Sequence, residues 1–208
     1  MPGSRLRDPL IFASTEAVQV SLFYLLLGRP SELTYLLYLL ITPLFFVLCF
    51  IYVRDVRENL RGAFLNNWIW LLVAVIIVFV FAYIADRQPV SFIFSTAYYP
   101  VLIEDLNFRY IFPVYLGRRV GMGRAIVIQS IVYTVFYLSA VVMQPGAYPG
   151  AYSVLFVLDM FATGIFYGGL YYLKRNPYPA ICAHLALYLM IPFVPASGGW
   201  FPYVVVPM

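Results

Sequence analysis

Long apolar segments, separated by short stretches rich in charged or turn-forming residues, run through almost the whole chain. About twenty apolar residues at a rise of 1.5 Å cross the roughly 30 Å hydrocarbon layer of a bilayer as one helix. We therefore predict an all-α fold, a polytopic bundle of about seven transmembrane helices. The predicted spans are residues 10–27, 33–53, 63–84, 91–116, 124–143, 153–173 and 179–194.

The composition excludes a soluble fold. Hydrophobic residues make up 63% of the chain and charged residues 11%, whereas an ordinary soluble domain has about 45–50% and about 25%. A protein of 208 residues could not bury so much apolar surface by itself. Since no linker, low-complexity tract or internal repeat divides the chain, residues 1–208 are predicted to form a single transmembrane domain.

The basic residues predict the orientation of the bundle, because cytoplasmic loops retain Lys and Arg. With the predicted spans, only Arg29 and Arg87 fall on one side, and Arg109 falls inside a span. The amino terminus is therefore predicted to be cytoplasmic, in a multi-pass protein that we expect in the plasma membrane. The residues on its side are Arg5, Arg7, Arg54, Arg57, Arg61, Arg118, Arg119, Arg124, Lys174 and Arg175.

Other interpretations of these features are less favoured. The basic residues form no continuous stripe, so the net charge of +4 does not indicate a nucleic-acid partner. Residues 10–27 have Glu16 in their middle and no cleavage site, which favours a span over a secretory signal. Cys49 and Cys182 lie far apart in apolar runs and are predicted to pack without a disulfide. Residues 194–208 are predicted to lie along the outer interface.

Six ionisable residues fall inside predicted spans, where such side chains are costly and mark a functional site or a structural pair. Asp105 and Arg109 are four residues apart, so they would share a helix face and form an ion pair. Pro100 would kink the helix just before Glu104. At 1.5 Å per residue, Glu16, Glu104 and His184 reach a similar level, roughly 10 Å from the cytoplasmic edge. The six residues are Glu16, Glu104, Asp105, Arg109, Asp159 and His184.

Two segments resemble motifs of a known family. The first resembles the EExxxR motif of the CPBP intramembrane proteases, which include the CaaX prenyl proteases and bacteriocin-processing proteins. The second, residues 161–173 with a basic turn and a helix reaching His184, resembles the closing region of that family, which ends in HxxxN. The resemblance covers a core of about residues 90–190. The first segment is Ile103-Glu104-Asp105-Leu106-Asn107-Phe108-Arg109.

The resemblance implies roles for individual residues. Glu104 matches the glutamate that activates water, and His184 matches a histidine that helps stabilise the oxyanion. Asp105, in place of a glutamate, and Arg109 match the residues that brace the site. Tyr137 stands at the histidine of the family's FxxxH motif, and likewise Tyr188 stands at the asparagine of HxxxN.

The tyrosine in the FxxxH position changes the chemistry that the site can perform. With an unperturbed pKa of about 10, Tyr137 cannot share a proton with a carboxylate near neutral pH as imidazole does. Gln129, Tyr133 and Tyr137 are spaced four residues apart and form a polar stripe that would instead hydrogen-bond Glu104. This stripe describes a scaffold at least as well as an enzyme.

Three functions remain open from the sequence. The first is an intramembrane endopeptidase that acts on a peptide or membrane-anchored substrate. The second is a catalytically silent relative that serves as a subunit of a membrane complex. A small transporter using Glu16, Glu104, Asp159 and His184 is less favoured, because no inverted repeat is found. A single histidine is a poor zinc ligand set, so we predict no metal or other cofactor.

Overall fold

Every element that the computed structural model describes is helical. It describes residues 4–29, 31–64, 67–84, 101–143 and 150–190. The predicted all-α class is thus confirmed for these residues. The elements are α1 (Ser4–Gly28), α2 (Glu32–Tyr52), α3 (Arg54–Ala63), α4 (Ile69–Ile84), α6 (Glu104–Leu106), the π-helix η3 (Asn107–Ile111), α7 (Phe112–Val120), α8 (Met122–Met143), α9 (Gly150–Lys174) and α10 (Tyr178–Met190).

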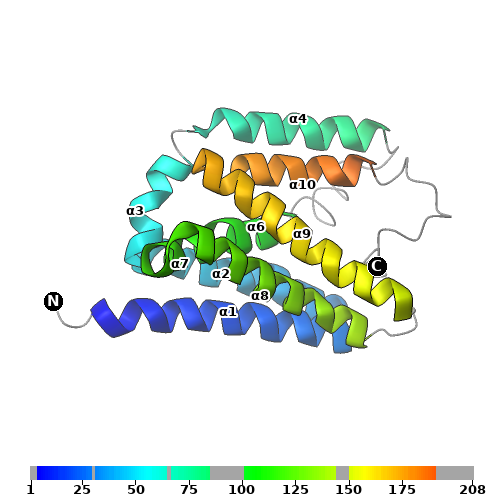
Figure 1. Ribbon diagram of the computed structural model, residues 1–208, viewed down its shortest axis with the longest axis horizontal. Helices are drawn as coiled ribbons and strands as arrows, with labels where there is room; N and C mark the ends of the chain where they lie inside the picture. The colour runs from blue at the N-terminus through cyan, green and yellow to red at the C-terminus, as the bar shows by residue number, and fades with distance from the viewer. Residues whose placement is uncertain (1–3, 30, 65–66, 85–100, 144–149, 191–208) are drawn as a thin grey trace.

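The long helices lie side by side, with α1 and α2 along one edge of the molecule and α4 and α10 along the opposite edge (Figure 1). The crossing helices α8 and α9 run between these two pairs, and α3 closes one end. The short α6 and η3 lie inside this frame, where Glu104, Asn107 and Arg109 are at most 1% exposed. The core of the bundle therefore contains Glu104 and Arg109, two of the polar residues that the sequence singled out.

Glycines bring α8 and α9 into close contact. A Cβ atom at Gly164 would lie 2.8 Å from Cβ of Ser130, and one at Gly168 would lie 2.8 Å from Cγ2 of Ile126. Small residues four positions apart let two membrane helices approach in this way. The spacing of Gly164 and Gly168 therefore serves helix packing.

Within the part of the chain that the structure describes, three helices are long and apolar enough to cross a membrane, at Arg7–Leu26, Glu32–Tyr52 and Val154–Lys174. Two shorter apolar helices cover Met122–Leu138 and Tyr178–Leu187. On α2, Leu33, Leu40 and Leu44 are each more than 60% exposed and are suited to contact lipid chains. The fourth predicted span begins outside the described residues, so the count of seven spans stays a prediction.

Two of the predicted connections are helical. Residues 54–61, read as a charged loop, belong to α3, where Val56 and Ala63 are 0% exposed and Leu60 packs against the core. Their spacing of four and three residues places them on one helix face, so the charges lie outward. Residues 117–119 form the last turn of α7. The helix ends before Gly121, which has a φ of 87°, a value that only glycine adopts easily.

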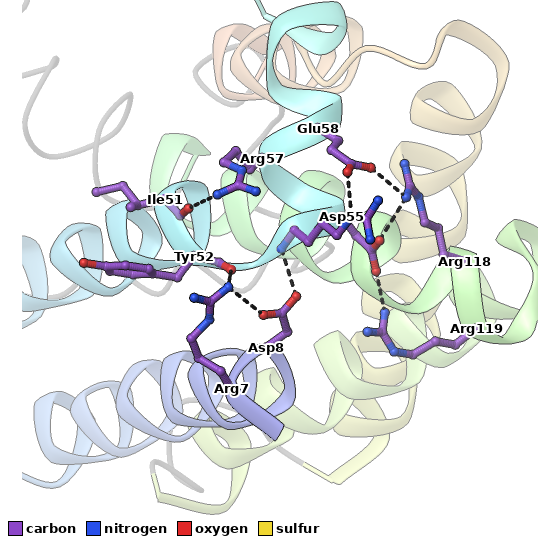
Figure 2. Close-up of polar contacts among 10 residues, drawn as sticks. Arg7, Asp8, Ile51, Tyr52, Asp55, Arg57, Glu58, Arg118 and Arg119 are labelled. Carbon is purple, nitrogen blue, oxygen red and sulfur yellow. Dashed lines mark hydrogen bonds and ion pairs between the residues drawn. The ribbon is translucent and has the colours of Figure 1, made fainter. Parts of the chain in front are cut away.

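Ion pairs fasten α3 to α7 at this end of the molecule (Figure 2). Asp55 accepts hydrogen bonds from Arg118 at 3.0 Å and from Arg119 at 2.8 Å. Glu58 accepts from Nε of Arg54 at 2.7 Å and from Arg118 at 3.0 Å. These bonds, first that from Arg54, lower the pKa of the exposed Glu58 carboxyl. These charged residues, which the sequence placed in loops, therefore join α3 to α7.

The start of α1 is tied to the same end. Asp8 accepts a hydrogen bond from the backbone N–H of Arg54 at 3.0 Å, and Arg7 donates to the carbonyl of Tyr52 at 3.2 Å. Phe64, just after α3, packs edge-on against Tyr178 of α10. Of the basic residues assigned to the inner side of the predicted topology, Arg7, Arg57, Arg118 and Arg119 lie together at this end of the bundle (Figure 2). We call it the basic end.

We expect Asp55→Asn to lower the free energy of unfolding in detergent by up to about 1 kcal/mol, because Arg118 and Arg119 lose their partner on α3. The loss should shrink as salt is added, since these side chains are partly exposed and screened. Thermal unfolding at low and high ionic strength measures it. Arg61→Gln, a charge change at an exposed site of α3, is the control. Equal midpoints for Asp55→Asn and wild type at low salt would contradict the role of these ion pairs.

Candidate functional site

Glu104 lies in a helix that is widened on both sides of it. Residues 101–103 and Asn107–Ile111 are π-helical, and the three residues of α6 lie between them. The N–H of Phe112 donates to the carbonyl of Asn107, five residues back. Single π turns are rare in proteins overall, but those that occur are often found at functional sites. Pro100, expected to kink this helix, lies outside the described residues.

Asp105 lies between the sole imidazole and a guanidinium. Nδ1 of His184 is 3.2 Å from Oδ2 of Asp105, and Nε of Arg109 is 3.6 Å from Oδ1. All three residues are at most 5% exposed. An ionised carboxylate only accepts hydrogen bonds, so a proton on Nδ1 of His184 suits this contact. The ion pair expected from the four-residue spacing of Asp105 and Arg109 is present, and His184 joins it.

The Arg109 guanidinium is enclosed by aromatic rings. Its central carbon lies 4.3 Å from the centroid of the Tyr133 ring and 5.4 Å from that of Tyr167. Arg109 is 0% exposed, and its nitrogens have no hydrogen-bond partner among the described residues. Cation–π contacts are worth about 2 kcal/mol or more when desolvated. The two rings and Asp105 therefore offset the cost of burying this charge.

Tyr167 joins the arginine to the histidine, and sequence reasoning missed it. Its ring also stacks on His184, with centroids 5.0 Å apart. The residue is 3% exposed and lies between Gly164 and Gly168 on α9. An aromatic residue beside glycines that draw two helices together was the available signal, because it must face the same interface. Tyr167 thus packs against both Arg109 and His184, the two partners of Asp105.

Glu104 is 1% exposed and pairs with α8. The hydroxyl of Tyr137 donates a hydrogen bond to Oε2 of Glu104. Of the polar stripe predicted on this helix, Tyr133 packs over Arg109, and Gln129 Oε1 faces α9, 3.1 Å from a Cβ placed at Gly168. Tyr137 thus makes the contact with Glu104 that the sequence predicted for the stripe.

Polar residues of α1 contact η3, which follows Glu104 in the chain. Nδ2 of Asn107 donates to Oε2 of Glu16 at 3.0 Å and also to Oε1 of Gln19. Asn107 and Gln19 are at most 1% exposed. Sequence reasoning placed Glu16 near the level of Glu104 but missed Gln19. Its position three residues after Glu16, on the same face of an apolar helix, was the signal.

The other candidate residues are Tyr188, Asp159, Cys49 and Cys182. The side chain of Tyr188, in the last turn of α10, lies outside the described side chains. Asp159 is partly exposed on α9. Cys49 and Cys182 are free and buried. Within the described ranges, no three His, Cys, Asp or Glu side chains come together as metal ligands.

We expect Arg109→Met to reduce the free energy of unfolding by about 3–5 kcal/mol, because it leaves the Asp105 carboxylate buried without its cation. The double variant Arg109→Met with Asp105→Asn should be more stable than Arg109→Met alone, since neither charge is then left unpaired. Denaturant unfolding in detergent measures both variants. A double variant less stable than Arg109→Met would show that the ion pair is not what stabilises this cluster.

A comparison with protein families identifies the region that contains these residues. The family model described as type II CAAX prenyl endopeptidase Rce1-like matches residues 86–190. This segment includes α6, η3, α7, α8, α9 and α10. Searches among curated proteins and among solved structures gave no match.

Proposed function

The chain belongs to the type II CAAX prenyl endopeptidase Rce1-like family, and from this premise we propose that it is an intramembrane endopeptidase. Its proposed substrate is a membrane-anchored peptide. The name of the family points to a prenylated peptide as one example. As an integral membrane protein of this family it contacts lipid, and its apolar helices agree with that setting.

One observation carries this proposal: the carboxylate next to Glu104 along the chain contacts the sole imidazole. In the proposed reaction Glu104 takes a proton from water, and the hydroxide attacks the scissile carbonyl carbon. His184 stabilises the oxyanion that forms, while Asp105 and Arg109 hold the imidazole and the helix in place. The C–N bond then breaks, and the leaving amine takes the proton back from Glu104.

The activity is tested with purified protein, a membrane-anchored fluorogenic peptide and a Glu104→Gln variant. We expect Glu104→Gln to lose about 10²- to 10⁴-fold in rate, because the amide cannot act as the general base. Glu58→Gln makes the same substitution at the exposed charged end and should cleave like wild type. Equal product from wild type and Glu104→Gln would remove the endopeptidase proposal.

The hydrogen bond from Tyr137 to Glu104 favours a second candidate, a catalytically silent relative that acts as a subunit of a membrane complex. The same peptide assay with Tyr137→His separates the two functions. A silent wild type that gains cleavage on Tyr137→His, and that co-purifies with other membrane subunits, supports the second candidate. A monomeric wild type with sustained turnover excludes it.

The basic residues gathered at the basic end support a topology for the bundle. We propose seven spans in the plasma membrane, with the basic end and the amino terminus in the cytoplasm. In a background with Cys49 and Cys182 replaced by Ala, a membrane-impermeant thiol reagent on intact cells should label Glu32→Cys. Arg61→Cys, at the basic end, should be labelled only after lysis. The opposite pattern of labelling would invert the orientation.

A further inference from the structure

The helix α1 precedes residue 86, where the family match begins, yet it contacts the helix that holds Glu104. Asn107 is three residues after Glu104 and is the first residue of η3. Its side-chain nitrogen donates to Glu16 and to Gln19, which are 91 and 88 residues away along the chain. These bonds connect a buried turn of the candidate site to a part of the chain outside the matched segment.

We propose that Glu16 and Gln19 are positioning residues that act through Asn107 and hold Glu104 in the geometry needed to activate water. This inference rests on the proposed function and adds to it the residues that orient the base.

The chemistry of the contact supports a positioning role. An Asn side chain has two N–H bonds and one acceptor oxygen, so donation to two acceptors uses its full donor capacity. With Asn107 0% exposed, losing either acceptor leaves an N–H without a partner in a region of low dielectric, which is costly. The side chain therefore has one favourable placement, and the π turn that begins at Asn107 is held with it.

Glu104 is sensitive to this turn because the backbone connects them directly. The N–H of Asn107 donates to the carbonyl of Glu104 at the junction of α6 and η3. A shift of Asn107 therefore moves the Glu104 backbone, while the Tyr137 bond contacts only its carboxylate. Displacement of a reacting group by about 1 Å can cost on the order of 10²-fold in rate.

Simple attachment of α1 to the bundle is the alternative, since polar side chains also hold membrane helices together. Attachment alone would lower stability and leave the turnover of folded protein unchanged. Positioning changes kcat with little change in KM, and it depends on a hydrogen bond between residues 16 and 107. A pair of substitutions that exchanges the donor and the acceptor of this hydrogen bond separates the two roles.

The experiment compares wild type, Asn107→Asp, and Asn107→Asp combined with Glu16→Gln. An ionised Asp at position 107 cannot donate and faces the Glu16 carboxylate, so we expect kcat to fall about 10²-fold with KM near the wild-type value. In the double variant the Gln side chain at position 16 donates to Asp at position 107, and most of the lost kcat should return. Ser14→Ala, at an exposed position of α1, should match wild type.

Hydrogen exchange of the amides of residues 101–111 gives a readout independent of cleavage. We expect faster exchange in Asn107→Asp and recovery in the double variant. Unchanged exchange in Asn107→Asp, or no recovery of both exchange and kcat in the double variant, overturns the inference. A wild type without peptidase activity that shows the expected exchange pattern supports the positioning contact and removes the proposed function alone. If Asn107→Asp does not fold, Gln19→Met carries the same two readouts.

Discussion

A buried guanidinium determines how the helices of this bundle meet. Arg109 has no access to solvent, so its charge must be balanced by groups inside the bundle. Asp105 supplies the opposite charge, and Tyr133 and Tyr167 supply aromatic faces from α8 and α9. Because His184 of α10 contacts the same carboxylate, α8, α9 and α10 converge on the ion pair formed by α6 and η3. The position of Glu104 follows from this arrangement, because Glu104 immediately precedes Asp105 in the chain.

The glycines of α9 make that convergence possible. Gly164 of α9 lies close against Ser130 of α8, and Tyr133 and Tyr167 each lie three residues further along their own helix. A side chain larger than glycine at position 164 would push the helices apart, because its Cβ would already be too close to Ser130. The rings would then separate from Arg109 and weaken the contacts that offset its burial. Packing and electrostatics in this bundle thus depend on the same interface.

Features set by single helices were predictable from the sequence, and features set by neighbouring helices were not. The apolar runs predicted α2, α8 and α9 within three residues, whereas α1 begins six residues before its predicted start, at Ser4. The Asp105–Arg109 pair follows from helical spacing alone. The charges of α3 resemble a loop until Arg118 and Arg119 of α7 are placed beside them. The roles of Gln19 and Tyr167 depend on which helices lie next to theirs, and no local pattern predicts the π turns around Glu104.

The two candidate functions differ in the path of one proton. A general base that takes a proton from water must pass it on before the next cycle. Tyr137 already donates its hydroxyl hydrogen to Glu104 and has no basic nitrogen, so it does not take over the proton as a histidine would. His184 contacts Asp105, and in the proposed reaction it stabilises the oxyanion. Catalysis in this site therefore requires Glu104 both to accept the proton from water and to return it to the leaving amine. If Glu104 cannot do both, its hydrogen bond to Tyr137 is a structural contact within a silent scaffold.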